Sequence, residues 1–282
     1  MTIKVMLLGI VALLAGCRER ELNMTLVQDT GYLAYPIHAI SASDVWNLKI
    51  VQDDGPSFIE LEYSAFMEEY MHINYVEDSF VFSIGWHSFR LPSNTVLNAT
   101  IHTDYLRALT LKDAAFAALE GDFHSPSMTM ELEDASKCRG GRFYGDAEIA
   151  LSDASNWVEC IFEGSDCKVE LNDASVFKGC LYISDNLTMT VDDASRFTDY
   201  WGEINRAHVK VSDAGILNMA TSWINSMYIE VTDASEATVN VVESLEGLVH
   251  DASKLFYSGE PVLNVDCDES STLQHVDYPN PE

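Results

Sequence analysis

One short motif recurs eight times between Leu109 and Ser253: apolar and polar residues alternate, and Asp-Ala-Ser or a close variant follows. Successive aspartates of this motif lie 21, 19, 20, 20, 20, 20 and 18 residues apart. A near-constant period indicates a repeat architecture, in which each unit packs on its neighbours along the chain. These aspartates, called the corner aspartates below, are Asp113, Asp134, Asp153, Asp173, Asp193, Asp213, Asp233 and Asp251.

Three sets of positions in the repeat are apolar in almost every unit. Residues four and two before each aspartate, such as Val209 and Val211, alternate with polar residues, and this period of two predicts a strand with one buried face. The residue four after each aspartate forms a second row: Ala117, Cys138, Trp157, Phe177, Phe197, Leu217, Ala237 and Leu255. The residue six before it forms a third row: Met128, Ala147, Cys167, Leu187, Ala207, Met227 and Leu245. We expect these rows to form the core, with Phe177 and Phe197 one above the other.

A repeat of this length, with short strands and no helical period, predicts an all-β fold: a parallel, right-handed β-helix of ~20-residue coils. Leucine-rich repeats share the period but require an Asn or Cys ladder and a helical return, which this sequence lacks. Asp-Ala-Ser is expected at the corner of each coil. Asp tolerates turn conformations and can accept a hydrogen bond from the N–H two residues on, and the Ser hydroxyl can bond the adjacent coil.

The first sixteen residues have the pattern of a signal peptide. Lys4 precedes an apolar run, Val5–Leu14, that is too short to span a bilayer. The sequence Leu-Ala-Gly-Cys that ends at Cys17 resembles the bacterial lipobox, in which the cysteine receives the lipid and becomes the new N-terminus. We therefore predict a lipoprotein signal peptide over residues 1–16 and lipidation of Cys17. This anchor would place the protein in the cell envelope, at the outer membrane.

The chain after the signal peptide divides into four parts by pattern. Residues 17–35 are predicted to be a tether. Residues 36–104 contain strand-like segments without the repeat, and we expect them to form an N-terminal β cap that hides the first open edge of the β-helix. A short helix is expected within the cap, over Tyr63–Met71. The β-helix repeats occupy residues 105–273, and residues 274–282 form a C-terminal tail.

The corner motif and the C-terminal pattern resemble those of the auto-transporter adhesin head domain family (GIN domain) of bacterial envelope proteins. The stretches Val209–Gly215 and Ile229–Ser235 match its repeated Val-x-Val-Ser-Gly-Ala-Ser motif, with Asp where Gly is usual. The stretch Leu248–Pro261 matches the family's ending, Gly-Ala-Ser-x-x-x-Tyr-x-Gly-x-Pro. The resemblance covers most of the chain after about residue 36. It implies a β-helical envelope protein with an adhesive or structural binding role.

The chain is strongly acidic, with 16 Lys and Arg against 45 Asp and Glu and a formal net charge of −29. Such a surface repels nucleic acids and anionic lipids and attracts cations and basic partners. The corner aspartates would stand in one ladder, roughly 5 Å apart, where like charges repel one another. Two interpretations are open: the aspartates are only turn residues, or Ca²⁺ binds between successive carboxylates, whose hard oxygens suit it. No other cofactor is expected.

Five cysteines follow Cys17, and they include no Cys-x-x-Cys motif. Cys160 and Cys180 each lie seven residues after a corner aspartate, so they are expected to stack in adjacent coils. Cys138 and Cys167 fall in the apolar rows. We expect core thiols, with a Cys160–Cys180 disulfide as the alternative.

The sequence contains no His-Glu-x-x-His, no Gly-x-Ser-x-Gly and no Gly-rich phosphate loop, and no position of the repeat is basic in two successive coils. We therefore predict a non-catalytic, lipid-anchored protein that faces the surface or the periplasm and binds a glycan or a surface protein. The alternative is a carbohydrate-active β-helix enzyme, a polysaccharide lyase or hydrolase. Such an enzyme needs clustered carboxylates and a basic residue in one cleft.

Overall fold

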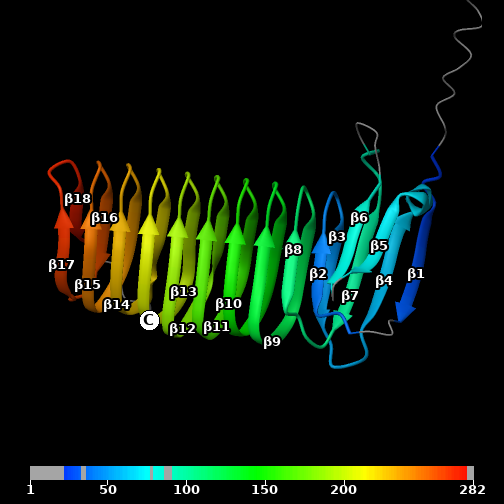
Figure 1. Cartoon of the computed structure of the whole chain (residues 1–282), viewed down its shortest axis with the longest axis horizontal. Helices are drawn as coiled ribbons and strands as arrows, with labels where there is room; N and C mark the ends of the chain where they lie inside the picture. The colour runs from blue at the N-terminus through cyan, green and yellow to red at the C-terminus, as the bar shows by residue number, and fades with distance from the viewer. Residues whose placement is uncertain (1–21, 33–35, 77–78, 86–90, 278–282) are drawn as a thin grey trace, which may run out of the picture.

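The computed structural model describes residues 22–32, 36–76, 79–85 and 91–277, and Figure 1 shows their arrangement. These residues form 18 hydrogen-bonded strands and the 3-10 helix η1 (Ala65–Glu69). The strands are β1 (Leu26–Tyr32), β2 (Ala39–Ala42), β3 (Asn47–Gln52), β4 (Phe58–Ser64), β5 (Met71–Val76), β6 (Ser79–Ile84), β7 (Leu97–Thr103), β8 (Ala108–Leu111), β9 (Phe116–Leu132), β10 (Lys137–Leu151), β11 (Asn156–Leu171), β12 (Val176–Val191), β13 (Arg196–Val211), β14 (Ile216–Val231), β15 (Glu236–Val249), β16 (Lys254–Ser258), β17 (Val262–Cys267) and β18 (Thr272–His275).

The long strands β9 to β15 each form almost one complete coil of a β-solenoid. Each runs parallel to the next, and equivalent residues of the repeat are paired, as Leu151 is with Leu171. Figure 1 shows tight turns along one edge of the stack and broad bends, within the long strands, along the opposite edge. We call these the corner edge and the mid-coil edge. The predicted parallel β-helix is confirmed.

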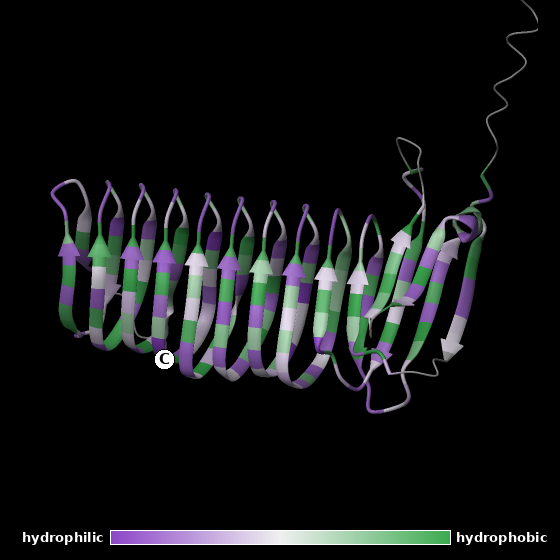
Figure 2. Cartoon of the chain, viewed as in Figure 1, coloured by the Kyte–Doolittle hydropathy of each residue, from purple (hydrophilic) through white to green (hydrophobic). Residues whose placement is uncertain are grey.

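The core lies between the two layers of strands and contains the predicted rows. Every residue of the rows four after and six before the corner aspartates is buried, and Figure 2 shows the alternation of hydropathy along the strands. Phe177 and Phe197 are paired and buried, with ring centroids 5.3 Å apart, as predicted. A second column, formed by Phe123, Phe143 and Phe162, stacks with centroid distances of 5.3 and 4.8 Å. Stacked aromatic rings therefore pack successive coils together.

A ninth corner, which the sequence analysis missed, precedes the first repeat corner by 69 residues. β2 and β3 form a coil that lies on β8 and β9, so that Leu48 pairs with Ala117. Asp44 stands at its corner with a φ of 64°, and its amide donates to the carboxylate of Asp113 (3.3 Å). The chain then forms the strands of the cap and reaches the first repeat coil only at β8.

The segment between β3 and β8 closes the N-terminal end of the core. β6 and β7 run parallel to β2 and β3, and antiparallel strands continue outward, with β5 beside β6, β4 beside β7 and β1 beside β4. The helix η1 brings Phe66 and Met67 into the core. It is shorter than the helix predicted over Tyr63–Met71, because β4 continues to Ser64 and β5 begins at Met71.

The structure corrects two predicted boundaries. β1 pairs with β4 over its whole length, so this part of the predicted tether, residues 17–35, belongs to the cap. Antiparallel pairing satisfies the backbone N–H and C=O groups that a tether would leave to water. At the other end β18 pairs with β16, so the last coil extends into the predicted tail, residues 274–282.

Candidate functional site

Each repeat corner from Asp134 onward is a turn whose two central residues are Asp and Ala. At Ser152–Ser155 the amide of Ser155 donates to the carbonyl of Ser152 (3.1 Å), and Asp153 and Ala154 have φ values of 52° and 62°. Positive φ at both central residues defines a type I′ turn, which favours Gly at its second central position. An Ala there costs about 1–2 kcal/mol. Other interactions must therefore hold the corner.

Hydrogen bonds between coils provide these interactions. The amide of Ala154 donates to the carbonyl oxygen of Asp173 in the next coil (2.8 Å), and the equivalent bond recurs along the repeat corners. Ser155 is fully buried, and its hydroxyl donates to the carbonyl of Leu132 in the preceding coil (3.0 Å). The predicted role of the corner serine is confirmed here. The turn itself is closed by a backbone carbonyl rather than by the aspartate side chain that we expected.

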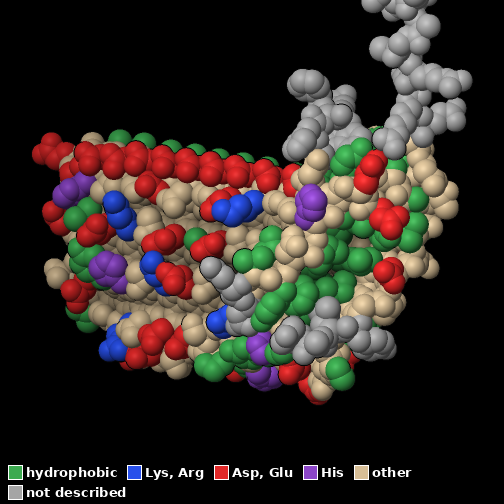
Figure 3. Space-filling model, turned by 45° about the vertical axis from the view of Figure 1, so that its right-hand side comes forward, with side chains coloured by type: hydrophobic (Ala, Val, Ile, Leu, Met, Phe, Trp, Pro, Cys, Tyr) green, Lys and Arg blue, Asp and Glu red, His purple; other side chains and the backbone are tan. Residues whose placement is uncertain are grey.

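All eight corner aspartates, Asp113 included, are exposed and have positive φ values. Figure 3 shows acidic side chains in a continuous row along one edge of the molecule, beside a row of hydrophobic side chains. The corner edge is therefore an acidic ladder whose backbone is fixed by its neighbours. Its carboxylates are accessible to ions in solution.

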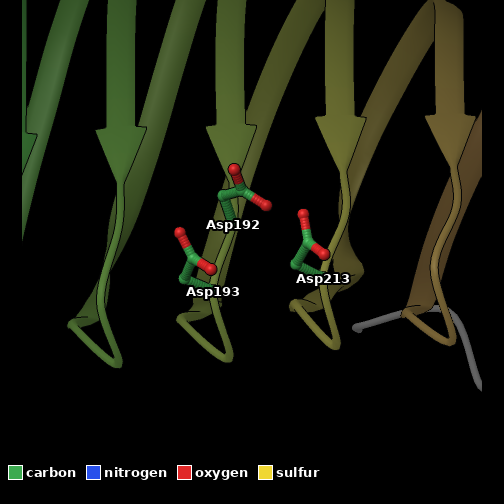
Figure 4. A group of neighbouring side chains, drawn as sticks. All are labelled: Asp192, Asp193 and Asp213. Atoms are coloured by element: carbon green, nitrogen blue, oxygen red, sulfur yellow. The ribbon is translucent and has the colours of Figure 1, made fainter.

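Three carboxylates gather between two successive corners. Asp192, Asp193 and Asp213 each place one oxygen within 4.8 Å of the others (Figure 4). Loss of hydration, and then the charge of Asp192, raises the pKa of Asp213. The hydroxyl of Ser212 donates to Asp192 (2.8 Å). Ca²⁺ needs about six to eight oxygens, so this group supplies only part of a coordination shell.

The turn at Asp268–Ser271 ends the ladder: the amide of Ser271 donates to the carbonyl of Asp268 (3.3 Å), and the side chain of Asp268 accepts further hydrogen bonds. Asp268 accepts the amide of Asp251 (2.9 Å) and both the amide and the hydroxyl of Ser270 (2.9 and 2.8 Å). These bonds, the one from Asp251 above all, hold the pKa of Asp268 far below its usual range. A carboxylate thus satisfies the amide groups at the end of the ladder.

The mid-coil edge carries a groove of about 930 Å³, lined by residues of β9 to β14. We call it the mid-coil groove. Its centre is a single outward position of the repeat, paired from coil to coil. In order along the stack this position holds His124, Tyr144, Glu163, Tyr182, Glu203 and Trp223. Aromatic and acidic side chains therefore alternate from Tyr144 onward.

Glycine and asparagine residues shape the floor and the rim of the groove. A side chain on Gly145 would meet the carbonyl oxygen of Ser125, and one on Gly164 would meet the carbonyl oxygen of Gly145, so the coils approach closely here. Glycine at these positions is therefore what allows the close approach of successive coils beside the aromatic row. On the rim, Asn225 donates to the side-chain oxygen of Asn205 (3.2 Å).

The residues that line the mid-coil groove include Asp146, Glu163 and Glu203 but no Lys or Arg within the described ranges. Arg142 lies beside it and is engaged by its neighbours. Its guanidinium donates to Glu163 (3.2 Å) and lies 5.1 Å from the centroid of the Tyr144 ring. The groove is therefore acidic, with one of its carboxylates paired.

The predicted stacking of Cys160 on Cys180 is wrong. A bulge at Glu159, whose φ is 62°, shifts the register, so that Cys160 pairs with Gly179 and Cys180 with Ile161. The cysteines of the described residues are free thiols, and the core placement is confirmed for those that are buried. The buried thiols are Cys138, Cys160 and Cys167.

The signal peptide over residues 1–16 and the lipidation site Cys17 lie outside the described residues. The described part of the chain contains no helix with the length and apolar content needed to cross a membrane.

Sequence reasoning found the corner edge but missed the mid-coil groove. The central position of the groove lies between nine and eleven residues after each corner aspartate. The residue type at this position changes from coil to coil, so a comparison that looks for one residue type at equivalent positions of the repeat does not detect it. A search for outward positions with exposed aromatic residues would have found it.

Three solved structures share this fold at low sequence identity. A protein of Parabacteroides distasonis named "putative adhesin" is 13% identical, with a TM-score of 0.67 over 89% of this chain and 97% of its own. A "putative adhesin" of Parabacteroides merdae is 11% identical, with a TM-score of 0.63 over 90% and 98%. A "putative lipid binding protein" of Parabacteroides distasonis is 10% identical, with a TM-score of 0.59 over 89% and 97%. No family model and no curated protein matches the sequence.

Proposed function

We propose that this protein is a lipid-anchored, non-catalytic binding module of the bacterial cell envelope, with an adhesive role. Cys17 carries the lipid and holds the protein at the outer membrane. The observation that carries the proposal is the mid-coil groove, an open path over β9 to β14 lined by aromatic, amide and acidic side chains. Such lining orients a ligand through a few polar contacts and packs against its apolar faces.

Two further observations support this role. The likeness to two structures named "putative adhesin" extends over about nine-tenths of the chain. The net charge of −29 opposes binding to nucleic acid. The partner is therefore a glycan or a protein on a surface. The β-solenoid, held by the lipid anchor, would present the groove to it.

A catalytic role, as a polysaccharide lyase or hydrolase, is less well supported. Glycoside hydrolysis requires two carboxylates that flank one scissile bond. Glu163 and Glu203 project from one outward row with Tyr182 between them, so they meet the same side of a ligand. Glu163 is also paired with Arg142 (3.2 Å), so its carboxylate already has a cationic partner.

The anchor is tested by the substitution Cys17→Ser in cells fed with labelled fatty acid. We expect the label to be lost from the protein and the protein to move from the membrane fraction to the soluble fraction. Cys267→Ser, at an exported cysteine outside the lipobox, is the matched control and should keep the label. Persistent labelling of the Cys17→Ser variant would rule out the anchor.

The adhesive role is tested with beads that carry the purified chain through its N-terminus. We expect such beads to adhere to cell or mucus surfaces more than beads with a heat-denatured protein. The same protein, incubated with polysaccharides, should release no new reducing ends and no unsaturated sugars. Release of either product would replace the binding role with the enzymatic one.

A further inference from the structure

We infer that the mid-coil groove binds an extended glycan built of neutral or amino sugars, without carboxylate or sulfate groups. The inference rests on the proposed function, since it names the class of ligand that the binding module takes. Four observations support it: the spacing of the aromatic residues, the polar groups between them, the charge of the lining, and the pairing of the groove strands with neighbours on both sides.

The aromatic residues recur at every second coil. Tyr144, Tyr182 and Trp223 occupy one outward row, and strand spacing places successive members roughly 9–10 Å apart. This distance is close to the length of two linked pyranose rings. The apolar face of a sugar ring packs on an aromatic ring, so a linear glycan that runs along the stack meets one such ring per disaccharide.

Trp223 is the strongest sign that this row faces a ligand. It is 43% exposed on a strand whose inward residues are buried. Exposure of a large aromatic side chain leaves apolar area in water that burial would otherwise stabilise. Tyr182 also has an aromatic neighbour at the same edge, Trp201, with a centroid distance of 5.4 Å.

Polar groups with both donors and acceptors stand between and beside the aromatic rings. Glu163 and Glu203 alternate with the rings, and Asn205 and Asn225 form the rim. Carboxylates accept hydrogen bonds from hydroxyl or ammonium groups, and side-chain amides both donate and accept. This set matches the hydroxyl and amino groups of sugars, which need partners when they leave water.

Charge separates this glycan from the acidic ones. The residues lining the mid-coil groove include three carboxylates and, within the described ranges, no Lys or Arg. The whole chain adds a net charge of −29. Uronic acids, sialic acids and sulfated sugars would be repelled, whereas neutral sugars are tolerated and amino sugars attracted.

The backbone argues against an extended peptide. Peptides that bind to sheets usually add a strand at an open edge and bond through their main chain. The groove lies across β9 to β14, and each interior strand of this set is paired with a neighbour on both sides. A peptide could therefore bind through its side chains only. From β9 to β14 the groove spans five strand spacings, roughly 24 Å, which accommodates several linked sugars.

The experiment measures binding of defined hexasaccharides to the purified full-length chain by calorimetry. The probes are chitohexaose, its deacetylated form, cellohexaose and hexagalacturonate. We expect at least one of the first three to bind and hexagalacturonate not to bind. Trp223→Ala and Tyr182→Ala should each raise Kd by about tenfold or more, as for other aromatic contact residues. Circular dichroism would check that the variants remain folded.

Tyr228→Ala provides the matched control. Tyr228 is another exposed aromatic residue of β14, but it stacks on His208 outside the groove, so its removal should leave Kd unchanged. Equal losses in the Tyr228 and Trp223 variants would overturn the inference. So would binding of hexagalacturonate, or the absence of binding by all three non-acidic probes. Binding of a hexalysine peptide that Trp223→Ala abolishes, with no sugar bound, would replace the glycan by a basic peptide.

The bead assay separates this inference from the proposed function. Beads that adhere although no non-acidic sugar binds would leave the adhesive role in place and remove the ligand class. Sugars that bind while the beads fail to adhere would do the reverse.

Discussion

The two edges of the solenoid are built on opposite principles. At the corner edge the repeat coils use nearly the same residues, because from Asp134 onward two successive residues adopt positive φ and the next must be small enough to be buried. At the mid-coil edge the chain bends without a tight turn, and the outward residue changes from Tyr to Glu to Trp between coils. The residues of the corner edge are uniform because the backbone conformation requires them. The outward residues of the mid-coil edge can vary on the same scaffold, so binding specificity can reside there.

The largest effect is expected in the core that joins the two edges. Phe177→Ala removes a fully buried ring that stacks on Trp157 and meets the ring of Phe197 edge to face. It should lower the free energy of unfolding by roughly 3–5 kcal/mol, measured by chemical denaturation. Because the core supports both edges, binding and corner geometry should be lost together. A loss below about 1 kcal/mol would contradict the register of this row.

The second effect tests the strand that leads to the mid-coil edge. Asp199 is buried, and burial raises its pKa from 3.8 to about 6, although Ser222 and Thr221 donate hydrogen bonds to it. A carboxyl group with a higher pKa in the folded state binds more protons there than in the unfolded state. Its contribution to stability is therefore greatest at low pH and falls as the pH rises from about 4 to about 6.

The size of this fall follows from the two pKa values. Their difference of about 2 corresponds to about 3 kcal/mol. Asp199→Asn should remove most of this decline, so that the free energies of unfolding of the two proteins diverge between pH 4 and pH 7. Asp153→Asn, at an exposed corner, is the control and should leave the pH dependence nearly unchanged. Parallel pH profiles for the Asp199 variant and the unmodified chain would contradict the argument.

The third effect compares Ala→Gly substitutions at the corner edge and within a strand. Ala154 has a φ of 62°, where an alanine side chain is strained, so Ala154→Gly should stabilise the protein by up to about 1 kcal/mol. Ala150→Gly, within strand β10, should instead destabilise it by roughly 0.5–1 kcal/mol. Denaturation curves of the two variants test this opposition. Destabilisation by both would mean that the alanine methyl at the corner makes a contact worth more than the strain.

The smallest effect concerns cations at the corner edge. We propose that Ca²⁺ binds weakly between carboxylates at Asp192, Asp193 and Asp213. At a Ca²⁺ concentration equal to Kd, one site adds about 0.4 kcal/mol. The melting temperature should then rise more in CaCl₂ than in NaCl of the same ionic strength. The gain should shrink for Asp193→Asn with Asp213→Asn and persist for Asp134→Asn with Asp153→Asn. Equal curves in both salts would leave the aspartates as turn residues alone.

The repeat and its core could be predicted because the relevant residues keep one type at one spacing. Trp157, Phe177 and Phe197 all stand four residues after an aspartate and are all buried. The register failed where spacing alone does not describe the backbone. The bulge at Glu159 moves Cys160 out of register with Cys180. The spacing of the repeat does not reveal a positive φ at a glutamate.

The coil with its corner at Asp44 and the mid-coil groove were not predicted from the sequence, for different reasons. Asp44 is followed by Val45 and Trp46 instead of Ala and Ser, and an inserted cap separates it from Asp113, so neither motif nor spacing identifies it. The mid-coil row is regular in space but mixed in residue type. Only the pairing of strands brings Tyr182, Glu203 and Trp223 into one line.

The coil formed by β2 and β3 precedes the cap in the chain, and this position also determines an order of folding. Corners of successive repeat coils lie 20 residues apart, as Ser175 and Ser195 do, whereas Asp44 must meet Asp113 across 69 residues. Closing the longer loop costs about 1 kcal/mol more in chain entropy. Local contacts form sooner than distant ones, so the repeats between β9 and β15 should fold first and serve as the template on which β2 and β3 dock.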